Sequence, residues 1–181
     1  MIVLSAELPP NELSITWRND SYATCRQPTL ISEEHHQKWK ESLIGNPKIK
    51  MFGIVDTEMM IVNMSNLKSR KNFVGQCGLT GIDHINRSAE YSILIGSEHR
   101  GRGYAKEAMR MLLRIAFDEL NLNRVWGEVI TNNPEGFNIA LKLGFEEEGT
   151  LRQTYFKDGQ YFGSKIVSIL EKEYRECCLQ S

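Results

Sequence analysis

The chain has 181 residues, 22 of them basic and 23 acidic, for a net charge of −1, and 41% of its residues are hydrophobic. This length and composition predict one globular domain, residues 1–181, with a full hydrophobic core. The balanced charge argues against a general nucleic-acid-binding protein, because such proteins carry a basic surplus. No apolar run reaches membrane-spanning length, and the first residues lack the basic segment of a signal peptide. We therefore expect a cytoplasmic protein with no nucleic-acid or membrane partner.

The four cysteines give no sign of a metal site. They are Cys25, Cys77, Cys177 and Cys178. None of them forms a CxxC pair, so we expect no zinc or other metal, and free thiols in a reducing compartment. Cys77 lies in an apolar stretch and is expected in the core.

The hydrophobic pattern predicts elements in the order β-α-α-β-β-β-α-β-α-β-β. From the N-terminus, we expect a strand at 2–4, helices at 9–18 and 33–43, strands at 51–55, 73–83 and 89–95, a helix at 104–120, a strand at 124–130, a helix at 134–143, and two terminal strands around a turn at 157–160. The segment 57–72 has no clear pattern and is interpreted as a long hairpin connection or a variable insertion. This order predicts an α/β (α+β) fold, with a mixed, mostly antiparallel sheet of six to seven strands flanked by helices.

Two local signals refine these elements. Ser32 precedes the second helix and is a plausible N-cap, because its hydroxyl can accept from a first-turn N–H. Gly75, Gly78 and Gly81 fall within the strand at 73–83 and predict weak points or bulges.

A glycine-rich loop connects a strand to the strongest helix. Residues 93–108 read ILIGSEHRGRGYAKEA, so Arg100, Gly101, Arg102 and Gly103 stand directly before the helix. Backbone N–H groups at such a loop, with the helix N-terminus and the arginines, can bind an anion such as a pyrophosphate. The sequence is not a P-loop, which has Lys-Ser/Thr after its last glycine, and it lacks the full GxGxxG of a Rossmann loop. Taken alone, the loop is equally compatible with a structural turn.

The loop matches a known signature. Residues 100–105, RGRGYA, fit the pattern Q/R-x-x-G-x-G/A, and on this basis the chain resembles the GNAT superfamily of N-acetyltransferases. Residues 132–134 and 142–145 resemble the family's N-x-x-(S/A)…K-x-G-F block. Residues 146–163, with the upstream segments at 17–19 and 32–36, resemble the spermidine and ribosomal-protein acetyltransferases.

The resemblance implies that the loop binds the pyrophosphate of acetyl-CoA. It also implies that the preceding strand splays from its neighbour and pairs through its backbone with the pantetheine arm. The implied cofactor contacts are Ile93, Leu94, Ile95, Arg100, Gly101, Arg102, Gly103, Tyr104, Ala105 and Asn133.

Direct acetyl transfer in a ternary complex needs a base for the amine, a polarised thioester carbonyl and a departing thiolate. Glu90 is the first candidate for the base, since related enzymes often carry a Glu on this strand; it could equally be a surface or ion-paired residue. Asp83 and His84 come second. Many relatives have a tyrosine as proton donor where this chain has Ala140.

Two tyrosines, Tyr155 and Tyr104, are alternative proton donors, although both are as readily explained by packing. The acceptor is predicted to be bound by Trp17, Arg18, Asn19 and His84. His36 is expected to be a packing residue, with a substrate role as the alternative. An acidic run at 146–148 is either part of a polyamine site or a solvated turn.

The sequence leaves several alternatives open. A protein N-terminus, a polyamine and an amino sugar are all possible primary-amine acceptors. A non-catalytic acyl-CoA-binding sensor or interaction module is the main alternative to an enzyme, and the absent tyrosine is its support. A third alternative, a nucleotide-binding protein that does not bind CoA, has little support once the motifs downstream of the loop are counted. The partners are therefore acetyl-CoA and an amine, and the protein is expected to be a monomer or a homodimer.

Overall fold

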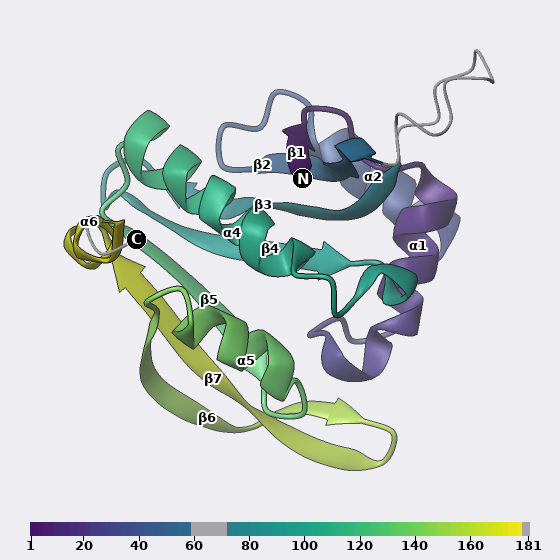
Figure 1. Ribbon diagram of the computed structural model, residues 1–181. Coiled ribbons are helices and arrows are strands. Elements are labelled where there is room, and N and C mark those ends of the chain that lie inside the picture. Colours follow the sequence, from purple (N-terminus) through teal and green to yellow (C-terminus); the bar gives the residue numbers. More distant parts are fainter. Residues whose placement is uncertain (59–71, 179–181) are drawn as a thin grey trace.

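The computed structural model describes residues 1–58 and 72–178. Within them the strands form one seven-stranded sheet in the order β1-β2-β3-β4-β5-β7-β6 (Figure 1). The strands are β1 (Ile2–Ser5), β2 (Lys50–Asp56), β3 (Phe73–Asp83), β4 (Ser88–Ile95), β5 (Arg124–Ile130), β6 (Glu146–Lys157) and β7 (Gln160–Leu170). Among the strand pairs of the described residues, only β4–β5 is parallel. The predicted fold class, a mixed and mostly antiparallel sheet with flanking helices, is confirmed.

The helices connect and cover the strands. They are α1 (Asn11–Asp20), α2 (Glu33–Leu43), α4 (Tyr104–Arg114), α5 (Pro134–Leu141) and α6 (Glu171–Cys178), with short 3₁₀ turns at Tyr22–Thr24 and Ser97–His99. In Figure 1, α4 crosses one face of the sheet, and α1 and α2 lie together at one end of it. Ser32 caps α2 as predicted, its Oγ accepting from the His35 N–H at 3.3 Å.

The long predicted helix at 104–120 has two parts. Its apolar face, Ala108, Met109, Leu112 and Leu113, is buried in the main core. After Arg114 the chain continues as a π-helical turn, Ile115–Glu119, which also buries Ala116 and Phe117. Phe117 stacks on Tyr174 of α6, with ring centres 4.9 Å apart.

Helix α6 was not predicted, although the sequence contained a signal for it. Glu171 and Arg175 are four residues apart, the spacing at which side chains meet on a helix. In the structure they form an ion pair at 2.8 Å, and Arg175 also bonds Asp118 at 2.5 Å. These contacts attach α6 to the end of the α4 segment.

Two further predictions concern irregular parts of the chain. A register shift interrupts the β3–β4 pairing between Thr80 and Asp83, and Gly81 there has a φ of +58°, so the bulge predicted in this strand is confirmed at Gly81. The interpretation of 57–72 falls mostly on residues 59–71, which lie outside the described residues. Among the helices described, none combines the length and the apolar character needed to cross a membrane.

The feature that positions the site is the separation of β4 from β5. The two strands pair only over Ser88–Glu90 and Arg124–Trp126, yet β4 continues to Ile95 and β5 to Ile130. β3 pairs with β4 as far as Ile95, so only the edge of β4 that faces β5 is left without a partner strand in the described chain. The predicted splayed strand pair is confirmed.

Candidate cofactor and acceptor site

The glycine-rich loop follows β4 directly and opens α4. Gly101 and Gly103 have φ values of +74° and +83°, a left-handed conformation that favours glycine. Gly103 is the N-cap of α4, and open space surrounds the position that a Cβ would take at either glycine. The first N–H groups of a helix have no intrahelical acceptor. The loop therefore offers backbone donors, with the exposed side chain of Arg102 beside them.

Trp17 supports this loop from beneath. Its indole N–H donates to Glu98 Oε1 at 2.9 Å, and its side chain is 1% exposed. A Cβ added at Gly96 would lie 2.4 Å from the indole nitrogen, so the backbone passes directly over the ring. The ring of His99 meets Trp17 edge-on, with centres 6.3 Å apart. These contacts are with the segment 96–103, called the cofactor loop below, and the predicted role of Trp17 on the acceptor side stays a prediction.

Tyr104 in the first turn of α4 points toward β2. Its hydroxyl donates to Asp56 Oδ2 at 2.5 Å, and Asp56 is buried. The hydrogen bond to this carboxylate raises the pKa of Tyr104, with a further rise from burial. This hydroxyl is therefore already committed to Asp56, and the structure does not bring it to Glu90.

A second group of side chains gathers where β4 and β5 begin to part. The Arg26 guanidinium bridges two carboxylates, bonding Glu90 Oε1 through Nη2 and Glu128 Oε2 through Nη1 at 2.9 Å. Glu128 Oε1 accepts from the Tyr155 hydroxyl at 3.0 Å and the Ser164 hydroxyl at 2.5 Å. These five residues are called the acceptor cluster below. The sequence pointed to Glu90 and Tyr155, but not to Arg26, Glu128 or Ser164.

The two carboxylates of the acceptor cluster differ in their partners. Burial alone would raise the pKa of Glu128, but hydrogen bonds from Ser164, Arg26 and Tyr155 outweigh it and lower that pKa. Burial and the neighbouring Glu128 raise the pKa of Tyr155, which keeps it a protonated donor. Glu90 Oε2, by contrast, has no donor in the part of the chain that the structure describes, and its side chain is 19% exposed. Glu90 is thus the carboxylate that retains a free acceptor.

Arg26 belongs to residues 21–31, called loop 21–31 below, which connects α1 to α2. Lys157 Nζ donates to the carbonyls of Tyr22, at 3.0 Å, and Gln27. Asn132 Nδ2 donates to the Ala23 carbonyl at 2.6 Å. Side chains from β6 and from the β5–α5 connection therefore hold loop 21–31 in place.

Two predicted cofactor contacts also hold this loop. Arg100 Nη2 donates to Ser21 Oγ at 2.5 Å. Asn133 Nδ2 donates to the Thr24 carbonyl at 3.4 Å, while its Oδ1 caps α5 by accepting from the Gly136 N–H at 3.0 Å. In this structure both residues contact loop 21–31, and their predicted roles toward acetyl-CoA stay predictions.

Arg18 and His36 lie between α1 and α2. The Arg18 guanidinium lies 4.8 Å from the centre of the Trp39 ring, and burial lowers its pKa. His36 is 1% exposed and packs on Trp39, with ring centres 5.1 Å apart. Burial, with smaller effects from Arg18 and Lys40, lowers the pKa of His36 to about 4. These contacts give His36 the packing role expected for it.

Asn19 also has a structural contact here. Its side chain donates to the Ile31 carbonyl at 3.1 Å and accepts from the Ile31 N–H at 2.8 Å. This pair closes the far end of loop 21–31 onto α1. The predicted acceptor roles of Arg18 and Asn19 stay untested.

The structure does not bring Asp83 and His84 to the acceptor cluster. They lie at the turn before β4, at the opposite end of that strand from the cofactor loop. Asp83 accepts from the N–H groups of Ile85 and Asn86, both at 2.8 Å. The bonds from Asn86 lead in lowering its pKa. Asp83 stabilises this turn, and His84 is exposed on it.

Two of the three glutamates in the acidic run at 146–148 are already paired. Glu147 bonds Lys165 at 2.8 Å, and Glu148 bonds Arg124 at 2.7 Å. The run is exposed, as the solvated-turn interpretation expected, but it begins strand β6 and is not a turn. The cations come from β7 and β5, so Glu147 and Glu148 are not the free acidic cluster that a polyamine site would use.

Ala140 is buried, 1% exposed, in the main core beside Leu143 and Phe145. Its methyl group supplies no proton donor at the position where many relatives have tyrosine.

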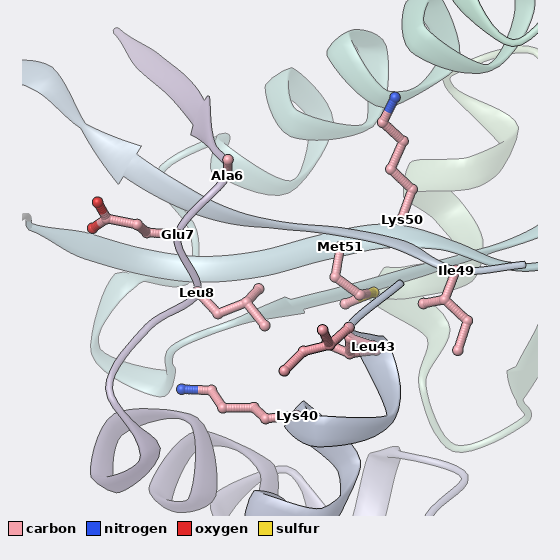
Figure 2. Close-up of a pocket in the computed structure, with 9 residues that line it drawn as sticks. Ala6, Glu7, Leu8, Lys40, Leu43, Ile49, Lys50 and Met51 are labelled. Atoms are coloured by element: carbon pink, nitrogen blue, oxygen red, sulfur yellow. The ribbon is translucent and has the colours of Figure 1, made fainter. Parts of the chain in front are cut away.

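A separate hollow of about 570 Å³ lies away from all of these residues. Figure 2 shows it between the end of β1, the C-terminal end of α2 and the start of β2. Its lining is mostly apolar, with Lys40 and Lys50 beside it. Lys40 Nζ donates to the Pro9 carbonyl at 2.9 Å. None of the predicted site residues lines this hollow.

A splayed parallel strand pair, with a glycine loop at a helix N-terminus beside it, is the arrangement expected of an acyl-CoA-binding acetyltransferase. Residues 11–146 match the acetyltransferase (GNAT) domain family, so the chain belongs to that family. The family predicted from the RGRGYA loop is therefore confirmed.

Relatives with assigned activities are acetyltransferases. The chain is 36% identical over 106 residues to spermidine N(1)-acetyltransferase of Vibrio cholerae, covering 59% of this chain and 61% of that protein. It is 27% identical over 157 residues to the same enzyme of Escherichia coli K12, covering 78% and 84%. The chain thus spans about 61% of the length of the first curated relatives that it matches.

The fold is similar to that of a solved relative. The structure of spermidine N-acetyltransferase from Vibrio cholerae in complex with CoA and spermine superposes with a TM-score of 0.80 at 26% identity. The match covers 96% of this chain and 98% of that one.

Proposed function

We propose that this protein is an acetyl-CoA-dependent N-acetyltransferase that moves an acetyl group directly onto a primary amine. The observation that carries the proposal is the opening between β4 and β5, with the glycine-rich loop at its wide end and the acceptor cluster at its narrow end. Family membership and CoA in the related structure support acetyl-CoA as the co-substrate.

The residues present fit acetyl-CoA. Gly101 and Gly103 leave space for a close approach of phosphates to backbone N–H groups, and Arg102 adds an exposed positive charge. The free edge of β4 at Ile93, Leu94 and Ile95 offers peptide groups to the amides of a pantetheine arm. When bound, acetyl-CoA supplies the acetyl group as an activated thioester.

Glu90 is proposed to take the proton from the acceptor's ammonium group, because its Oε2 is free and the residue stands at the last pair before β4 and β5 separate. The neutral amine then forms the N–C bond as the C–S bond breaks, its second proton passes to solvent water, and the sulfur leaves as a thiolate. A backbone N–H on the free edge of β4 is proposed to polarise the carbonyl. Since Ala140 provides no acid, the thiolate is expected to leave without a side-chain proton donor.

Among the acceptors, a polyamine leads. Relatives that act on spermidine support it. A protein N-terminus and an amino sugar remain as alternatives that rest on the resemblance alone.

The second candidate function is a non-catalytic acyl-CoA-binding module. The specific observation in its favour is the buried methyl group of Ala140 at the usual position of the acid.

The test is to incubate the purified protein with acetyl-CoA and a panel of polyamines, peptide N-termini and amino sugars. Released CoA is measured with a thiol reagent, with a correction for the four protein cysteines. Turnover with one class would identify the acceptor. Acetyl-CoA binding without turnover would favour the non-catalytic module, and the absence of both would overturn the proposal.

We also propose that the chain is a single cytoplasmic domain that forms a monomer or a homodimer. The sheet edge supports the dimer, because β6 is an edge strand with few buried residues. Near its hairpin tip, Phe156 and Tyr161 are exposed and pack together, with ring centres 4.9 Å apart. Light scattering coupled to gel filtration would distinguish the two oligomeric states.

A further inference from the structure

The acceptor cluster already contains a cation. Among the residues that the structure describes, Arg26 is the only basic side chain that pairs with Glu90 or Glu128. One guanidinium against two carboxylates leaves the cluster with a net charge of −1. A planar guanidinium suits this position, because its forked N–H groups can bond two carboxylates at once.

Arg26 is held in this position from outside the cluster. Loop 21–31 is bonded on both sides of Arg26, by Lys157 to Tyr22 and Gln27 and by Asn132 to Ala23. The Arg26 side chain is also partly buried, with 36% of its surface exposed. The guanidinium is thus a fixed part of the site wall rather than a side chain free in solvent.

We propose that Arg26 is a specificity-determining residue that sets how much positive charge the acceptor can carry. This inference rests on the proposed function, since it takes the cluster as the acceptor site. A cluster of net charge −1 balances one ammonium group. A second ammonium group a few methylene groups away gains little binding energy from the carboxylates. Arg26 neutralises one carboxylate and also repels this second ammonium group.

Removal of Arg26 would reverse this preference. Without its guanidinium the cluster carries two uncompensated carboxylates, and a polycation gains more than a monoamine. A unit charge roughly 12 Å away, at an effective dielectric constant of about 20, changes affinity about tenfold. Removal of a carboxylate instead, at Glu128, leaves the cluster with no net charge and should disfavour polycations.

The experiment compares n-butylamine, 1,4-diaminobutane and spermidine as acceptors. Each is measured by kcat/KM with acetyl-CoA and by calorimetric binding in the presence of CoA. Arg26→Gln should raise the preference for spermidine over n-butylamine about tenfold, and Glu128→Gln should lower it by a similar factor. Arg26→Lys, which keeps the charge but not the forked guanidinium, should change this preference clearly less than Arg26→Gln does.

The matched control is Arg124→Gln. Arg124 is on β5 like Glu128, and it forms an ion pair with Glu148 at 2.7 Å outside the acceptor cluster. It should leave the acceptor preference unchanged. General damage to the fold would move both Gln variants of the cluster in the same direction, so the opposite signs are the diagnostic result.

An unchanged ratio, or the same direction of change in Arg26→Gln and Glu128→Gln, would overturn the inference. Failure of all three amines to bind any variant would overturn it as well. The calorimetric measurement does not depend on turnover. If the unaltered protein binds amines but transfers no acetyl group, the proposed function is contradicted. The binding preferences of the variants would still test the role of Arg26.

Discussion

The cofactor loop and the acceptor cluster lie at the two ends of the same opening, yet they are built differently. The loop at 96–103 is one contiguous segment that works mainly through backbone N–H groups and left-handed glycines. The acceptor cluster joins loop 21–31 and four strands, β4, β5, β6 and β7, and works entirely through side chains. A backbone site tolerates sequence change around its glycines, whereas a side-chain site changes its specificity with a single substitution.

The largest effect is expected at Trp17, where the two regions meet. Its helix leads into loop 21–31, and its indole supports the cofactor loop. Trp17→Ala should lower the free energy of unfolding by about 3–5 kcal/mol, because it leaves a large cavity. Urea denaturation followed by circular dichroism measures this loss. Trp17→Phe, which keeps a ring but loses the bond to Glu98, should lose clearly less; equal losses would contradict the packing role.

Glu90→Gln should separate the two regions functionally. It should lower kcat by about 100-fold, because Gln cannot take the amine proton, and leave acetyl-CoA affinity unchanged. Steady-state kinetics and calorimetry measure the two quantities. Glu148→Gln is the control, since it removes a carboxylate paired with Arg124 outside the cluster. A similar fall in both variants would exclude Glu90 as the base.

His36 should make the α1–α2 side of the protein sensitive to pH. Its pKa is about 4 in the folded protein, against an ordinary value of 6.5. Between these values the unfolded chain binds a proton that the folded chain does not, so stability falls as the pH falls through this window. The linkage relation gives about 3 kcal/mol near pH 4, and solvent screening should reduce the loss to about 2 kcal/mol. Urea denaturation from pH 7 to pH 4 should show it, and His36→Gln should flatten that part of the curve; an identical pH dependence in the variant would refute it.

The smallest effect concerns the backbone of the cofactor loop. Gly103→Ala places a Cβ on a left-handed residue, which costs roughly 1–2 kcal/mol and should weaken acetyl-CoA binding about tenfold if the loop shifts to relieve it. Calorimetry with acetyl-CoA measures this change. Gly81→Ala imposes a similar conformation at the β3 bulge, φ +58°, and should leave the affinity unaltered. Equal weakening by both would show that the loop geometry is not what matters.

The same contrast explains which features could be predicted from the sequence. The loop at 100–105 could be predicted, because its residues are adjacent in the chain and their conformation follows from glycine and helix-capping rules. The splay of β4 was expected only because the loop signature resembles that of a known family. Arg26 and Glu128 could not be, because they are 102 residues apart and meet only through the packing of loop 21–31 on the sheet. The contact of Trp17 with Glu98 could not be predicted either, because the sequence cannot show which face of α1 meets the cofactor loop.

Lys157 connects the β6–β7 hairpin to loop 21–31. It is 2% exposed near the tip of the β6–β7 hairpin, with its Nζ 3.9 Å from the centre of the Tyr22 ring (Figure 1). The hairpin and the segment that carries Arg26 therefore share one anchoring point. If the acceptor cluster binds an amine as proposed, thermodynamic reciprocity requires that a hairpin contact that displaces this anchor and so changes amine affinity is itself changed by amine binding by the same factor. Contacts made by β6 and β7 can thus influence the acceptor cluster through loop 21–31.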